Sequence, residues 1–223
     1  ATFFIMGGLN LLAFLIALFL LPESSRRKAG ERYNLSFKEM GASSMVKGLF
    51  SFRVAEALGR GGISTFLPIF AAALGLSTSI IGTLLTINIL SVTRFMPLGG
   101  LIADRFGRRT LTIIGSVLFA ILLAAIPLIN SFWLLLGVLL IQGLTAAVSM
   151  PASSALAVEE GRKYGMGSTM SMLFLAMSIG MALGPIISGG IADLVNINSV
   201  FYLGAAIGLA GTALFIWFTR GYR

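Results

Sequence analysis

The sequence predicts an all-α membrane protein, and three observations support this fold class. Hydrophobic residues make up 57% of the 223-residue chain and charged residues only 11%, with a mean hydropathy of +0.97. Long apolar runs recur along the whole chain. Lysine and arginine are concentrated in alternate gaps between those runs. A soluble protein needs no such composition, so we expect a lipid bilayer as the surrounding medium.

Seven apolar segments are long enough to cross a membrane. A spanning helix needs about 20 mostly apolar residues, because each residue rises only ~1.5 Å and every backbone polar group must bond within the helix. The uncharged run from 110 to 158 is long enough for two helices, which the turn residues of 127–131 divide. The spans are expected at Thr2–Leu21, Leu49–Ala73, Ile80–Leu101, Thr110–Ile129, Phe132–Val158, Gly165–Ala192 and Val200–Thr219.

The distribution of basic residues predicts the orientation, because cytoplasmic loops carry an excess of lysine and arginine. The gaps on one side hold Arg26, Arg27, Lys28, Arg32, Lys38, Lys47, Arg105, Arg108, Arg109, Arg162, Lys163, Arg220 and Arg223. The gaps near 75–79, 130–131 and 193–199 hold neither residue type. We therefore expect the N-terminus outside and the C-terminus in the cytoplasm.

Composition also argues against several classes of function. The net charge of +8 comes from basic residues scattered between apolar runs, which is not typical of a nucleic-acid-binding face. The chain has no cysteine and no histidine, so thiol chemistry and the commonest metal ligand are missing. We expect no cofactor, no metal and no enzymatic activity, because no nucleophile with a base and no phosphate-binding glycine loop is found. Any proton chemistry would have to use carboxylates.

A compact charged motif lies between the third and fourth expected spans. Its pattern is Gly-x-x-x-Asp-Arg-x-Gly-Arg-Arg, formed by Gly100, Asp104, Arg105, Gly107, Arg108 and Arg109. This pattern resembles the signature of the short cytoplasmic loop in transporters of the major facilitator superfamily. The order of one span, a basic linker and six spans is similar to the sixth helix, central loop and C-terminal half of a twelve-helix member.

The resemblance implies three parts: a membrane helix at 1–21, a cytoplasmic interfacial linker at 22–48 and a six-helix transporter bundle at 49–223. It implies secondary transport of a small molecule by alternating access, closest to the multidrug or small-solute antiporter branch, in the plasma or inner membrane. A missing N-terminal half would then be the partner, although a separate half-transporter is an alternative. The alternative function is a non-transporting membrane scaffold or receptor of the same fold.

The resemblance gives the charged motif the function of a gate. Asp104 can accept hydrogen bonds at the N-terminus of a neighbouring helix, and the arginines can bind carboxylates in a forked geometry. We expect Arg108 or Arg109 to pair with Glu159 or Glu160. The alternative is that these charges only set topology, since an exposed pair contributes ~0–1 kcal/mol.

Proline and small residues recur near the ends of two spans. The segments 97–104 and 185–193 are similar to each other, which predicts two inverted three-helix repeats. The second segment contains Gly180, Gly184, Pro185 and Gly189, with Ser188 in place of a further glycine. It resembles an element of proton-coupled antiporters, in which close helix packing and a proline bend allow rocking. Simple packing is the alternative.

Ionisable residues inside membrane spans are costly and usually functional. Arg53, Glu56 and Arg60 share one helix face, because their spacings are three and four residues. An ion pair at the cytoplasmic end of the span is the alternative for them. The residues that we expect to line a cavity or to couple transport are Glu56, Arg60, Ser64, Arg94, Gln142, Thr145 and Ser149.

Overall fold

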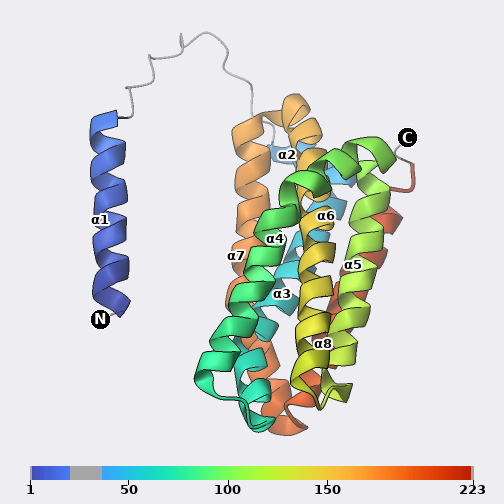
Figure 1. The fold of residues 1–223 in the computed structure, drawn as a ribbon. Helices are drawn as coiled ribbons and strands as arrows, with labels where there is room; N and C mark the ends of the chain where they lie inside the picture. Colours follow the sequence, from blue (N-terminus) through green and yellow to red (C-terminus); the bar gives the residue numbers. More distant parts are fainter. Residues whose placement is uncertain (1, 21–36, 222–223) are drawn as a thin grey trace. The chain divides into compact units, whose positions relative to one another are not determined.

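The computed structural model describes residues 2–20 and 37–221, and these residues form helices without any strand (Figure 1). Residues 21–36, which include most of the predicted linker, lie outside the described residues. The chain divides into two compact units, Ala1–Asn34 and Leu35–Arg223. The first unit contains the apolar helix α1 (Thr2–Leu20), whose bounds agree with the first predicted span.

The second unit begins with the short helix α2 (Phe37–Ala42), which is followed by the long helix α3 (Ser44–Ala73). Ser43 caps α3, because its hydroxyl oxygen accepts a hydrogen bond from the backbone N–H of Val46. This cap starts α3 five residues before the predicted Leu49. Its C-terminal end at Ala73 agrees with the prediction.

The charged motif is helical, which corrects the expectation of a loop between two spans. Helix α4 runs over Thr78–Phe106, beyond the predicted end at Leu101, and α5 begins at Arg108 and ends at Ala125. Gly107 alone separates them, with φ of +91°, a backbone conformation that glycine adopts without strain. The motif is therefore a helix end, a one-residue turn and a helix start.

The second half of the bundle also has short connections. A 3₁₀ turn, η1 (Ile126–Leu128), lies between α5 and α6 (Phe132–Tyr164). The predicted division of the long apolar run into two helices at 127–131 is therefore confirmed. Helix α6 passes the predicted end at Val158 by six residues. Gly165, with φ of +94°, separates it from α7 (Met166–Leu194), and α8 (Asn198–Phe218) completes the bundle.

Five helices in the described part of the chain are long and apolar enough to cross a membrane: α4, α5 with η1, α6, α7 and α8. Helix α3 has 30 residues but is not among the five, since Arg53, Glu56 and Arg60 lower the hydropathy of its middle part. The apolar stretch of α1, Phe4–Phe19, is shorter than the five.

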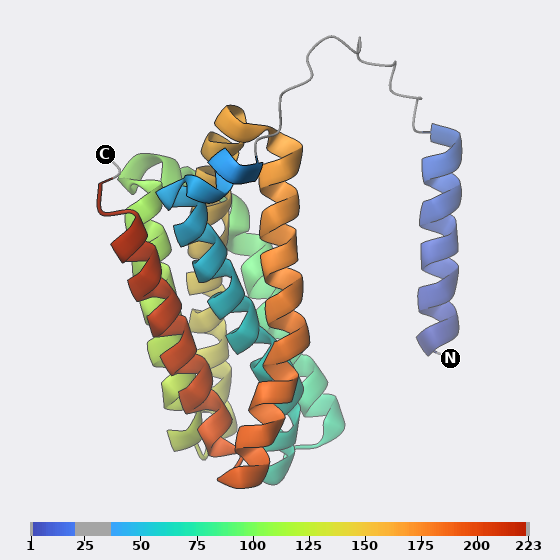
Figure 2. The ribbon, with the colours of Figure 1, turned by 180° about the vertical axis from the view of Figure 1, so that it is seen from behind.

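The bundle has two layers of three helices each. Helix α6 packs between α4 and α5 in one layer (Figure 1), and α3 packs between α7 and α8 in the other (Figure 2). Contacts of α5 with α8 and of α6 with α7 join the layers. The central helices α3 and α6 thus lie inside the bundle, which places their side chains between the layers.

Two hydrophobic clusters fill the two ends of the bundle. One lies around the C-terminal half of α3, where the rings of Phe70 and Phe201 meet edge to face with centroids 5.2 Å apart. The other lies around its N-terminal half, where Phe52 meets Phe215 at 5.6 Å. Such ring pairs contribute ~0.5–1.5 kcal/mol beyond the buried area. Arg53, Glu56 and Arg60 of α3 lie along the stretch between the two clusters.

Small residues bring α3 and α7 into close contact. A Cβ atom at Gly180 would lie 2.5 Å from the Cβ of Ala57, and one at Gly184 would lie 2.5 Å from the carbonyl oxygen of Leu58. Ser188 occupies the space beside Gly62 on the same face. The glycine spacing is thus used for helix packing, as close approach of membrane helices requires.

Candidate functional site

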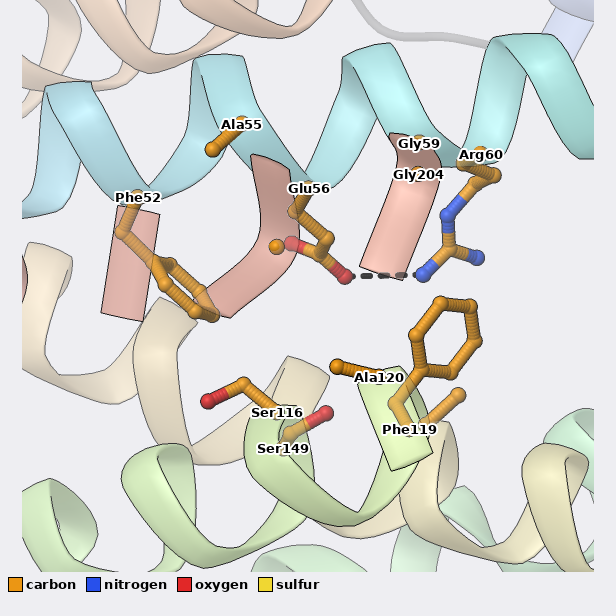
Figure 3. Close-up of a pocket in the computed structure, with 12 residues that line it drawn as sticks. Phe52, Ala55, Glu56, Gly59, Arg60, Ser116, Phe119, Ala120, Ser149 and Gly204 are labelled. Atoms are coloured by element: carbon orange, nitrogen blue, oxygen red, sulfur yellow. Dashed lines mark hydrogen bonds and ion pairs between the residues drawn. The ribbon is translucent and has the colours of Figure 1, made fainter. Parts of the chain in front are cut away.

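Three charged side chains of α3, the charge triad Arg53, Glu56 and Arg60, form a continuous ion-pair chain. Glu56 Oε2 lies 3.3 Å from Arg53 Nη1. Glu56 Oε1 lies 2.8 Å from Arg60 Nη2, and Figure 3 shows this second pair as a dashed line. The side chains of Arg53 and Glu56 are 11% and 16% exposed, whereas that of Arg60 is 36% exposed. Two cations share one carboxylate, so the charge triad carries a net charge of +1.

Neighbouring helices hold both arginines in place. Arg53 Nη2 donates a hydrogen bond to the hydroxyl of Ser154 on α6, 2.9 Å away. The Arg60 guanidinium lies 6.0 Å from the ring centroid of Phe119 on α5, which is within the range of a cation–π contact. Ser154 and Phe119 could not be predicted as partners of the arginines, because no spacing along the chain connects them with α3.

A small cavity lies against the charge triad (Figure 3). Its volume is about 20 Å³, and polar groups from three helices face it: Glu56 and Arg60 from α3, Ser116 from α5 and Ser149 from α6. A space of this size with several polar partners suits a single water molecule. The small cavity therefore offers the Glu56 carboxylate a route to hydroxyl groups on two other helices.

A large cavity of about 270 Å³ lies on the other side of Arg60. Arg60, Phe119 and Ala146 line both cavities and so form the wall between them. The lining residues of the large cavity are Arg60, Ile63, Ser64, Leu67, Leu85, Asn88, Ile89, Val92, Phe119, Leu139, Gln142, Gly143, Ala146 and Met181. The large cavity is mostly apolar with a few polar groups, as is typical of small-molecule sites.

The three polar residues of α6 that were expected to line a cavity do not share one cavity. Gln142 lines the large cavity and Ser149 the small one. Thr145 lines neither, and its hydroxyl donates to the backbone carbonyl of Gln142. The Nε2 atom of Gln142 is buried and has no hydrogen-bond partner in the described residues. Asn88 of α4, which also lines the large cavity, donates from Nδ2 to the Leu139 carbonyl at 2.7 Å.

Arg94 lies apart from the other cavity candidates. It is exposed on α4 and lines neither cavity. No ion pair joins it to another residue in the described ranges. Ser64, in contrast, lines the large cavity together with Arg60, one helical turn away.

Asp104 and Arg108 of the charged motif form an ion-pair cluster with Glu159 of α6, which we call the Arg108 cluster. Arg108 Nη1 lies 2.9 Å from Glu159 Oε1, and its Nη2 lies 2.8 Å from Asp104 Oδ1. The expected pairing of Arg108 with Glu159 is thus present, between residues 51 positions apart in the chain. Arg109 instead donates from Nε to the Thr219 hydroxyl at 2.9 Å.

Glu160, the other expected charge partner, has a different environment from Glu159. It is only 1% exposed, and it accepts hydrogen bonds from Lys163 Nζ at 2.7 Å and from Ser43 Oγ at 3.1 Å. Ser43 also caps α3, so Glu160 joins the end of α6 to the beginning of α3. The contact with Lys163 has a signal in the sequence, because Glu160 and Lys163 are three positions apart and so share a helix face.

A bundle of long apolar helices that keeps its charged and polar groups inside is typical of integral membrane proteins. Residues 49–223 match the family model described as Major Facilitator Superfamily. The chain belongs to this family, and it is an integral membrane protein.

Two bacterial proteins are among the relatives of this chain. The "Multi-drug resistance efflux pump PmrA" of Streptococcus pneumoniae is 28% identical over 142 residues, which cover 62% of this chain and 35% of that protein. The "Quinolone resistance protein NorA" of Staphylococcus aureus is 28% identical over 152 residues, which cover 68% of this chain and 39% of that protein. The chain thus matches less than half the length of these relatives.

Proposed function

We propose that this chain forms the C-terminal half of a secondary transporter that moves a small molecule by alternating access, with protons as the coupling ion in antiport. The observation that carries this proposal is the charge triad of α3 between two cavities inside a bundle of this family. A partly buried carboxylate with cationic neighbours, next to a substrate-sized space, is suited to exchange a proton for a ligand. The names of the relatives support a drug-like small molecule as the substrate.

We assign the domains as 1–21, 22–48 and 49–223, with seven spans that include α1 and α3. The charges of α3 do not prevent it from spanning, because Glu56 binds both arginines. Arg53 is buried against Ser154 of α6, and Glu56 and Arg60 line the small cavity. An α-helix of 30 residues extends ~45 Å, longer than the hydrocarbon core. The N-terminal half of the transporter is the partner that this arrangement needs.

The two-layer arrangement supports the inverted repeats α3–α4–α5 and α6–α7–α8. The first helix of each repeat packs between the second and third helices of the other: α3 between α7 and α8, and α6 between α4 and α5. Each repeat thus contributes its first helix to the layer that contains the other two helices of the partner repeat, so the two repeats make corresponding contacts. Inverted repeats place the binding site between them, where the two cavities lie.

The orientation is tested by labelling single cysteines, since the native chain contains none. Arg105→Cys, at the α4–α5 turn, is expected to react with a membrane-impermeant maleimide only in inside-out vesicles. Asn196→Cys, at the α7–α8 turn, is expected to react in intact cells. The reverse pattern would place the N-terminus in the cytoplasm and contradict the topology.

The Arg108 cluster is proposed as a latch that stabilises one conformation. Its ion pairs are partly exposed, with side-chain exposures of 32% for Arg108 and 43% for Glu159, so they contribute little to folding. Asp104→Asn is therefore expected to change the free energy of unfolding by less than about 1 kcal/mol. Transport by the complete transporter is expected to fall, because one conformation loses a stabilising contact.

Asp104→Asn is measured by thermal unfolding in detergent and by initial transport rates. Arg162→Gln, an exposed charge change at the end of α6, is the control. Unchanged transport kinetics in Asp104→Asn, with an unchanged distribution of conformations, would remove the latch function.

Alternating access itself is tested with Ser64→Cys in the large cavity. In the complete transporter, this cysteine is expected to react with a permeant thiol reagent, and impermeant reagents are expected to reach it from each side of the membrane in different states. Substrate and a proton gradient should shift the two labelling rates in opposite directions. A cysteine sealed from both sides in every condition would favour the scaffold or receptor function instead.

A further inference from the structure

The walls of the large cavity combine many apolar side chains with a few polar ones. Most lining side chains are apolar and come from α3, α4, α6 and α7, such as Leu67, Ile89, Leu139 and Met181. The described residues that line it include no aspartate or glutamate. Among these described lining residues, the one charged group is the guanidinium of Arg60. The cavity therefore offers an apolar space with one cationic end.

Arg60 keeps hydrogen-bonding capacity for a ligand. Its Nη2 donates to Glu56, while its Nε and Nη1 atoms have no hydrogen bond to another residue in the described ranges. Glu56 is shared with Arg53, so the charge triad keeps a net charge of +1 beside the cavity. A guanidinium with free donors binds a carboxylate through charge-assisted hydrogen bonds.

Gln142 provides a second polar group in the same cavity. It is 4% exposed, and its Nε2 is the one buried side-chain nitrogen or oxygen without a hydrogen-bond partner among the described residues. An unpaired buried donor is unfavourable, and a ligand oxygen would give this amide an acceptor once the amide turns toward the cavity.

We propose that the large cavity binds amphipathic organic anions, with a carboxylate or similar oxyanion at Arg60 and Gln142 and an apolar body along α4 and α7. This inference rests on the proposed function and specifies the substrate class of the same site. The opposite charge is disfavoured, because a cationic ligand would meet Arg60 without a carboxylate of its own.

The test uses three ligands with the same ring system: 2-naphthoate, its neutral analogue 2-naphthamide and the cation 2-naphthylmethylammonium. Binding to the full chain in lipid nanodiscs is measured by calorimetry, with empty nanodiscs to subtract partition into lipid. We expect 2-naphthoate to bind about tenfold or more tightly than the ammonium compound, which corresponds to one charge-assisted hydrogen bond. Equal affinities, a preference for the cation or no binding at all would overturn the proposal.

Three variants locate the anion. Arg60→Gln is expected to abolish the preference for 2-naphthoate over 2-naphthamide, Arg60→Lys to keep part of it, and Gln142→Met to weaken 2-naphthoate binding by ~3-fold to 10-fold. Arg162→Gln, at an exposed position outside the cavity, should leave the preference unchanged. A preference that survives Arg60→Gln would contradict the assignment.

Binding at equilibrium needs no turnover, so a chain that selects 2-naphthoate but supports no transport would reject only the proposed function.

Discussion

Gly180→Leu is expected to separate α3 from α7 and to prevent stable assembly of the bundle. Even the first added atom, a Cβ, would lie 2.6 Å from the Val54 carbonyl oxygen and 2.8 Å from the Leu58 backbone nitrogen. These are backbone atoms of a helix, so they cannot turn aside as a side chain can. Overpacking of this kind costs ~1–3 kcal/mol, and a leucine adds three more carbons to the same space.

The matched control for this substitution is Gly190→Leu, on the same helix. Gly190 is exposed, and a Cβ there would meet no atom within 4 Å. Both variants add the same side chain to α7, so they differ only in contact with α3. We expect the thermal unfolding midpoint in detergent to fall strongly for Gly180→Leu and to stay near that of the parent for Gly190→Leu. Equal midpoints for the two variants would show that the α3–α7 contact is not tightly packed.

The close helix contact and the charge triad were predictable because both depend on local spacing. Residues three and four positions apart share a helix face, which brought Glu56 next to Arg53 and Arg60. The pairing of Arg108 with Glu159 was also predictable, but for another reason. Charges on the same side of the membrane have few partners, so topology alone restricts the choice.

The environment of the charge triad was not predictable from the sequence. Ser154 and Phe119 contact the arginines from other helices, and their positions depend on how α5 and α6 pack against α3. The same holds for Glu160, whose hydrogen bond to Ser43 joins residues 117 positions apart. Hydrophobic periodicity determines which face of a helix is buried, but not which helix covers it.

The helical form of the charged motif shows a further limit of sequence reasoning. A cluster of charges between apolar runs predicts a connection, yet Ile102, Ala103 and Arg105 continue α4 without a break. Hydropathy locates the membrane boundary, whereas the helix ends where the backbone must turn, at Gly107. Asp104 lies before this turn and Arg108 after it, four positions later in the sequence, and the two side chains form an ion pair.

Glu56→Gln is expected to separate the contribution of the charge triad to stability from its proposed contribution to proton coupling. Glutamine keeps the size of the side chain but leaves Arg53 and Arg60 without a counter-charge. Because the pairs are only partly buried, we expect a loss of about 2 kcal/mol, between the values for exposed and fully buried pairs. Glu56→Asp, which keeps the charge, should lose less.

In the complete transporter, Glu56→Gln is expected to stop accumulation driven by a pH gradient while exchange of substrate across the membrane continues. A glutamine cannot release a proton, so the substrate would no longer be linked to proton movement, although the conformational change remains possible. The control is Asp193→Asn, an exposed carboxylate at the end of α7 that lines neither cavity. Accumulation that remains proton-driven in Glu56→Gln would assign coupling to a carboxylate outside the charge triad, and the small cavity beside Glu56 would then be a packing feature rather than a proton route.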